Sequence, residues 1–115
     1  MSEIKQAEAN ARNLHANVVS VLREGSRNIK SAKQTVDSMR IAISMARENA
    51  KVTADEIRYL KQQLVIGGST LDSVLSAEAR LYEAEAQEIN FTAEQRKAQL
   101  LILASLGLLS DLMGR

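Results

Sequence analysis

Apolar and small residues recur at alternating steps of three and four along the first half of the chain. One series places a residue every seven positions: Ile29, Val36, Ile43, Ala50, Ile57 and Leu64. A second series runs beside it: Ala32, Met39, Ala46, Thr53 and Leu60. This spacing is typical of a coiled-coil seam, in which one stripe of a helix packs against a partner. The pattern therefore predicts a long helix over residues 2–65.

The residues before Ile29 form two further series, namely Ile4, Ala11, Val18 and Gly25, and Ala7, Leu14 and Val21. Because Val18 and Ile29 are eleven residues apart, we expect a stutter near Gly25 that locally unwinds the supercoil. The segment LREGSRN, residues 22–28, also offers a break, since glycine disfavours a helix interior by about 1 kcal/mol and Ser26 can cap a new helix.

The second half of the chain carries two adjacent stripes and predicts a helix over residues 71–109. The first stripe comprises Leu75, Ala79, Tyr82, Ala86, Ile89, Ala93, Leu100 and Leu103. The second comprises Val74, Ala77, Leu81, Ala84, Phe91, Ala98 and Ile102. Polar residues interrupt both, Arg96 in the first and Glu88 and Gln95 in the second. Two stripes are typical of a helix with a neighbour on each flank.

The first predicted helix has a weaker second stripe of its own, formed by Ala42, Met45, Val52 and Tyr59, with the polar residues Asn49 and Glu56 among them. The expected fold is all-α, a long antiparallel coiled-coil hairpin in which residues 1–115 form a single helical segment. If the first helix is continuous, roughly its first 25 residues extend beyond the returning helix and lack a partner within the chain. A break near Gly25 gives instead a three-helix bundle of residues 2–24, 26–65 and 71–109.

The predicted turn lies in the segment VIGGSTL, residues 65–71. Gly67-Gly68 suits a helix C-terminus and a chain reversal, because glycine tolerates positive φ. Ser69 or Thr70 then caps the second helix, and Asp72 places a negative charge in its first turn. The two apolar residues Val65-Ile66 stand where water should reach them. Exposed apolar groups at the end of a helical rod indicate docking to a partner.

Composition narrows the function classes. Charged residues make up 25% of the chain with a formal net charge of +1, so no nucleic-acid footprint is present. The chain contains no cysteine and one histidine, His15, so neither thiol chemistry nor a metal site is predicted. The residues MSEIKQAEANAR are polar and unlike a signal peptide. No apolar run is long enough to span a bilayer. We expect no enzyme activity and no cofactor.

Residues 66–109, IGGSTLDSVLSAEARLYEAEAQEINFTAEQRKAQLLILASLGLL, resemble the C-terminal repeat of TolC-like outer-membrane channel proteins. That family shows a glycine, a short Ser/Thr turn, a run like L-D-x-L-x-A, and a Leu or Leu-Tyr that opens an Ala-rich helix ending L-G-x-L. The matching residues are Gly67, Thr70, Leu71, Val74, Leu75, Ala77, Leu81, Tyr82, Ala84, Gly107 and Leu109. Upstream, IKQAEANARNL resembles the start of the long helix that descends from the channel's β-barrel.

The resemblance implies a piece of a homotrimeric outer-membrane channel, used in type I secretion or multidrug efflux. This chain would be a periplasmic helical hairpin of its second repeat, with membrane contact only through parts absent here. The turn would dock a periplasmic adaptor, the membrane fusion protein, which joins the channel to an inner-membrane pump. The implied docking residues are Val65, Ile66, Gly67, Gly68, Ser69, Thr70 and Leu71.

The chain departs from the family at the turn. Relatives often carry Arg where Ser69 stands and carboxylates where Ser73 and Ser76 stand. The resemblance therefore does not imply that an arginine at the turn holds the channel entrance closed, nor that a ring of carboxylates guards it. Relatives also carry larger residues at Gly25-Ser26. Two other classes remain open on the sequence: the α-hairpin of a periplasmic adaptor, and a cytoplasmic coiled-coil scaffold.

Overall fold

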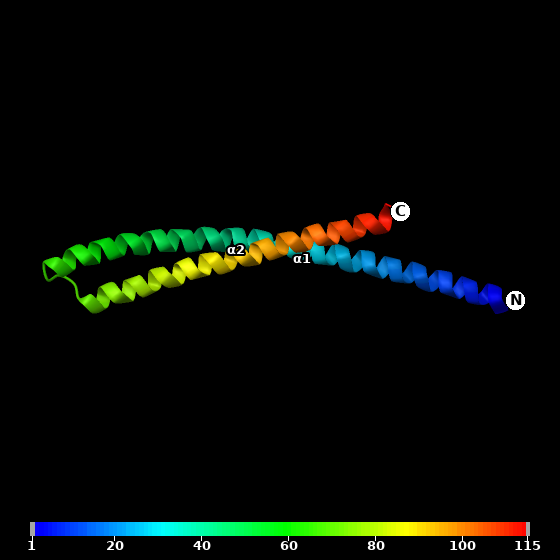
Figure 1. The fold of residues 1–115 in the computed structure, drawn as a ribbon, viewed down its shortest axis with the longest axis horizontal. Helices are drawn as coiled ribbons and strands as arrows, with labels where there is room; N and C mark the ends of the chain where they lie inside the picture. The colour runs from blue at the N-terminus through cyan, green and yellow to red at the C-terminus, as the bar shows by residue number, and fades with distance from the viewer. Residues whose placement is uncertain (1, 115) are drawn as a thin grey trace. The chain divides into compact units, whose positions relative to one another are not determined.

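A computed structural model describes residues 2–114 as two helices joined by a short turn (Figure 1). Helix α1 spans Ser2–Val65 and helix α2 spans Leu71–Met113. The all-α hairpin expected from the heptad pattern is thus confirmed, and α1 has the predicted bounds. Helix α2 continues past the predicted end at residue 109, because Ser110 and Asp111 add no glycine or proline that would stop it.

The predicted break at Gly25 is wrong, and with it the three-helix bundle. Helix α1 passes through Gly25 without interruption. A methyl group added at Gly25 would lie 3.2 Å from Cδ2 of Leu109, so the glycine gives that leucine room to pack. The favourable packing of α2 against this position offsets the poor helix propensity of one glycine.

The stutter expected near Gly25 is also wrong. Gly25 stands seven residues before Ala32 and seven after Val18, so all three occupy one heptad position. The residues of α1 that lose exposure there follow steps of four and three, namely Val18, Leu22, Gly25, Ile29 and Ala32. The seam therefore keeps its phase, with glycine serving as one of its small residues.

The structure divides into two segments. The tip segment is residues 35–97, and the end segment is residues 2–34 together with 98–114. In the end segment, Ala32 on α1 and Ala98 and Ser105 on α2 are buried. Residues 2–17 of α1 are exposed throughout, as expected for a part of the helix that extends beyond its partner.

In the tip segment the two helices pack through small residues. The buried positions are Ile43, Ala46, Thr53 and Ile57 on α1 and Val74, Ala77 and Ala84 on α2. Ala77 is 0% exposed and Ala84 is 1% exposed, so neither leaves space for a larger side chain. Alanine at such positions lets the two backbones approach closely. The stabilisation then comes from dense packing of many atoms rather than from the burial of large side chains.

The inward stripe of α2 is the second of the two stripes read from the sequence, the one interrupted by Glu88 and Gln95. Both polar residues find partners on α1. Glu88 Oε1 accepts a hydrogen bond of 2.6 Å from Arg47 Nε, and Gln95 Nε2 donates one of 3.3 Å to the carbonyl oxygen of Val36. These partners remove most of the cost of placing polar groups in the seam.

We expect Ala77→Leu to destabilise the hairpin by about 1–3 kcal/mol, because a leucine at this fully buried position must push the helices apart. Ala104→Leu is the matched control, since Ala104 is exposed on the same helix and lies outside both stripes, and it should change stability by no more than about 0.5 kcal/mol. Urea unfolding followed by circular dichroism measures both. Equal effects of the two substitutions would contradict the close packing at Ala77.

Candidate functional site at the turn and along two stripes

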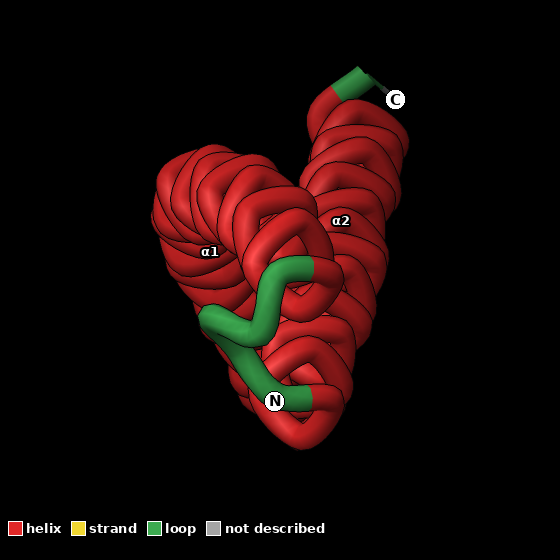
Figure 2. The backbone as a smooth tube through the Cα atoms, turned by 90° about the vertical axis from the view of Figure 1, so that its left-hand side faces the viewer, coloured by secondary structure: helices red, strands yellow, loops and turns green. Residues whose placement is uncertain are grey.

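The turn begins with a tightly closed end of α1. The amide of Gly68 donates to the carbonyl of Gln63 (2.7 Å) and the amide of Gly67 donates to that of Leu64 (3.3 Å). This pair of bonds is the Schellman motif, which needs a left-handed residue at its centre. Gly67 supplies it with φ of +82°. The loop that follows is the green segment nearest the viewer in Figure 2.

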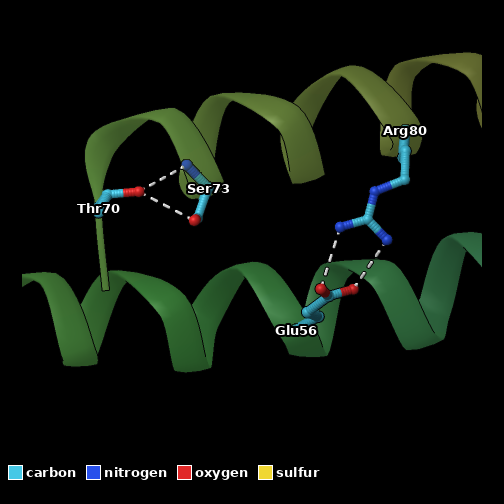
Figure 3. Close-up of polar contacts among 4 residues, drawn as sticks. All are labelled: Glu56, Thr70, Ser73 and Arg80. Atoms are coloured by element: carbon cyan, nitrogen blue, oxygen red, sulfur yellow. Dashed lines mark hydrogen bonds and ion pairs between the residues drawn. The ribbon is translucent and has the colours of Figure 1, made fainter. Parts of the chain in front are cut away.

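The turn ends with a side-chain cap on α2. Thr70 Oγ1 accepts a hydrogen bond of 3.1 Å from the amide of Ser73, and the hydroxyls of the two residues lie 2.9 Å apart (Figure 3). Of the two caps left open by the sequence, Thr70 is thus the N-cap residue. Ser69 has a different role, because its Oγ donates a hydrogen bond of 2.6 Å to the carbonyl oxygen of Leu60 and ties the loop back to α1.

Three apolar side chains project from this fixed turn. Val65 is 87% exposed, Ile66 is 74% exposed and Leu71 is 59% exposed. Val65 ends α1, Leu71 begins α2, and Ile66 lies in the loop between them. The C-cap and the N-cap hold the backbone there, so these groups are presented at a turn of defined geometry. The residues implied for adaptor docking therefore lie together at the turn, while the docking itself stays a prediction.

Ion pairs bridge both flanks of the tip segment. On one flank, Arg80 of α2 makes two hydrogen bonds to Glu56 of α1, at 3.0 and 3.2 Å (Figure 3). The hydrogen bonds and the charge of Glu56 raise the pKa of Arg80. On the other flank, Lys61 Nζ lies 3.3 Å from Glu78 Oε1.

Each flank carries one exposed apolar stripe. The α1 stripe is Met45, Val52 and Tyr59, and the α2 stripe is Leu75, Tyr82 and Ile89, all largely exposed. Glu56 is four residues after Val52 on α1, and Glu78 is four residues before Tyr82 on α2, so each acid shares a helix face with its stripe. Because Glu56 and Glu78 bridge opposite flanks of the hairpin, the two stripes lie on opposite flanks as well.

A shallow open groove of about 470 Å³ runs beside the Arg47–Glu88 pair and is lined by Arg40, Ile43, Ser44, Arg47, Glu48, Lys51, Thr92 and Gln95. Two of its cations are already paired, Arg40 with Asp37 at 3.3 Å and Arg47 with Glu88 at 2.6 Å. We therefore interpret the groove as the solvent-exposed edge of the contact between α1 and α2.

Across residues 2–114, no three acidic or histidine side chains come together in a way that would hold a metal ion. Within the same residues no helix is long and apolar enough to cross a membrane. What distinguishes this surface is therefore its apolar turn and its two stripes, which are features of contact with other macromolecules.

In comparisons with known proteins, no family model matches the chain, and no curated protein or solved structure matches it significantly.

We expect Gly67→Ala to destabilise the hairpin by about 1 kcal/mol, because alanine pays for the left-handed conformation that the turn imposes. Gly107→Ala is the matched control. Gly107 lies inside α2 with open space around its Cα, so there alanine should stabilise the helix by up to about 1 kcal/mol. Thermal and urea unfolding report both values. A stabilising Gly67→Ala would contradict the Schellman geometry.

Proposed function

We propose that this chain is a wall segment of a trimeric outer-membrane export channel, whose turn docks a periplasmic adaptor protein. The observation that carries the proposal is the turn itself, where three exposed apolar side chains stand in and beside a loop that is capped at both ends. A loop without a partner gains nothing from presenting apolar groups to water. The resemblance of residues 66–109 to TolC-like channels supports the same assignment.

The two stripes are consistent with the role of a wall segment. A helical hairpin in the wall of a tunnel touches a neighbour on each side, and this hairpin presents one apolar stripe on each flank. A two-helix protein that works alone would be expected to leave both flanks polar. In this proposal the wall segment lies in the periplasm, and the barrel that enters the membrane belongs to other parts of the channel.

The proposed mechanism is passive. The channel supplies a path across the periplasm and the outer membrane, and an inner-membrane pump supplies the energy. The adaptor joins the two, so the turn determines whether a channel is recruited to its pump. The pair Leu81-Tyr82 and the apolar ending LILASLGLL favour type I secretion over multidrug efflux.

Photo-crosslinking in cells that naturally produce the protein tests the docking. A benzoylphenylalanine at Val65 should crosslink to a periplasmic adaptor that mass spectrometry identifies, and the adduct should fractionate with the outer membrane. Ser44 is the control position, because it is exposed on α1 but remote from the turn, and it should give no adaptor adduct.

Other adducts at Val65 would contradict the proposal. A crosslink to an outer-membrane channel would make this chain the hairpin of an adaptor. Crosslinks to cytoplasmic proteins alone would indicate a cytoplasmic scaffold. Absence of any adduct at Val65, in cells that contain the protein, would contradict the proposal that the turn docks a partner.

A further inference from the structure

We propose that the end segment binds the surface of an anionic lipid bilayer along one flank, through a basic ridge on α1 and an apolar ridge on α2. The basic ridge is Arg23, Lys30 and Lys33, and the apolar ridge is Leu103, Leu106 and Met113, all exposed. The inference does not depend on the proposed function. The resemblance to TolC-like channels implies membrane contact only through other parts of the protein, so this contact is an additional one.

The basic ridge occupies one face of α1. Lys30 is three residues before Lys33 and seven residues after Arg23, so the three side chains are neighbours on the helix surface. No ion pair among residues 2–114 includes any of them. In the tip segment, by contrast, cations are paired with acids, namely Arg40, Arg47, Arg58, Lys61 and Arg80. The basic ridge thus keeps its positive charge available for a partner outside the chain.

The apolar ridge has the same spacing on α2. Leu106 is three residues after Leu103 and seven residues before Met113, so these side chains are neighbours as well. They stand outside the seam, where Ala98 and Ser105 are the buried residues of this part of α2. A row of exposed apolar side chains indicates a surface that another body covers.

Heptad position places the two ridges on the same flank. Lys33 stands four heptads before Lys61, and Leu106 stands four heptads after Glu78. Lys61 and Glu78 meet across one flank of the hairpin at 3.3 Å. In the end segment the residues directly before Lys33 and Leu106 are buried, so the same heptad positions again project to one side of the seam.

The ridges also stand at the same level along the helices. A methyl group added at Gly25 would lie 3.2 Å from Cδ2 of Leu109, so these two positions face each other. Because the helices are antiparallel, Leu106 is then level with residue 28 of α1, and Leu103 is level with residue 31. The apolar side chains therefore lie directly beside the cations at positions 23, 30 and 33.

The nearest acids lie on the other flank. Glu24 stands three heptads before Met45 and thus on the flank of the α1 stripe. Asp111 stands four heptads after Glu83, which lines a groove with Arg80 on that same flank. The flank with both ridges therefore presents cations beside apolar groups without an acid among them.

A bilayer surface matches this combination, because its headgroups can be anionic and apolar acyl chains lie directly below them. The long stems of lysine and arginine let their charges reach the headgroups while neighbouring leucines enter the interface. Nucleic acid fits less well, since residues 2–34 and 98–114 contain no aromatic side chain on which a base could stack. A soluble acidic protein is the alternative that the experiment must separate from lipid.

Vesicle flotation with the full chain tests the contact. The chain should float with vesicles of phosphatidylcholine that contain about one-third phosphatidylglycerol, and not with vesicles of phosphatidylcholine alone. Binding should weaken as salt is added, because the ridge cations supply the attraction.

Paired variants locate the contact. Arg23→Gln with Lys30→Gln should weaken binding to the anionic vesicles about thirtyfold, since each cation near such a surface is worth about fivefold in affinity. Lys51→Gln with Arg58→Gln is the matched control, because it removes the same charges four heptads further along α1, and it should change binding less than about twofold. Circular dichroism should show unchanged helix content for both, as all four positions are exposed.

The apolar ridge has its own pair of variants. Leu106→Gln should weaken binding about fivefold, because less apolar area enters the interface. Leu108→Gln is the control, since Leu108 is exposed but stands four heptads after Arg80, on the other flank, and it should bind like the unaltered chain.

Each other outcome overturns the inference. Absence of flotation removes the contact, and equal flotation with neutral and anionic vesicles removes the role of the basic ridge. An equal loss in the control Lys51→Gln with Arg58→Gln shows that overall charge, not the ridge, drives binding. A chain that binds soluble polyglutamate but not vesicles has an acidic protein as its partner.

A fluorescent label reports the orientation directly. The chain has no cysteine of its own, so Leu106→Cys and Leu108→Cys can each carry one environment-sensitive dye. With anionic vesicles, the emission at position 106 should shift to shorter wavelength and the emission at position 108 should not, because only the first position enters the interface. Equal shifts at both positions would contradict binding through a single flank.

Discussion

Close contact between small residues on facing helices is the constraint on which the rest of this structure depends. Ala77 and Ala84 of α2 are almost fully buried against α1, whereas many of the chain's large apolar side chains are exposed. Each helix buries only a narrow stripe in this way. Beside the buried Ile43, Ile57 and Val74, many of the larger apolar residues consequently stand outside the seam, at the turn and on the outer flanks.

The geometry of the turn is also set by this close packing of α1 and α2. A hairpin held by small residues needs its helices to end at matching levels, and the Schellman motif at Gly67 with the Thr70 cap sets those ends. Ser69 adds a bond from the loop to Leu60. With the backbone fixed in this way, Val65 and Ile66 have no inward position to occupy. Their exposure follows from the geometry of the turn and makes the docking role chemically reasonable.

The sequence was sufficient for much of this fold and misleading for part of it. Heptad spacing and the Gly67-Gly68 pair placed both helix boundaries at the turn, since local propensity and pattern agree there. Gly25 was misread as a break because the contact with Leu109 that favours a small residue lies far away in sequence. The stutter was inferred by joining Val18 to Ile29, whereas Val18, Gly25 and Ala32 continue one seven-residue series. Which stripe of α2 faces α1 was also undecidable, since Glu88 and Gln95 look unsuited to a seam until Arg47 and the Val36 carbonyl appear as partners.

The central claim is that one seam holds α1 and α2 side by side in the tip segment. Spin labels on cysteines at Ser44 and Asn90, diluted in excess unlabelled chain, test it by pulsed electron paramagnetic resonance. Both positions are exposed. With helix axes about 8–10 Å apart, the account predicts a single narrow distance below about 30 Å. A distribution centred near about 70 Å, the length of the intervening chain as one continuous helix, would contradict it.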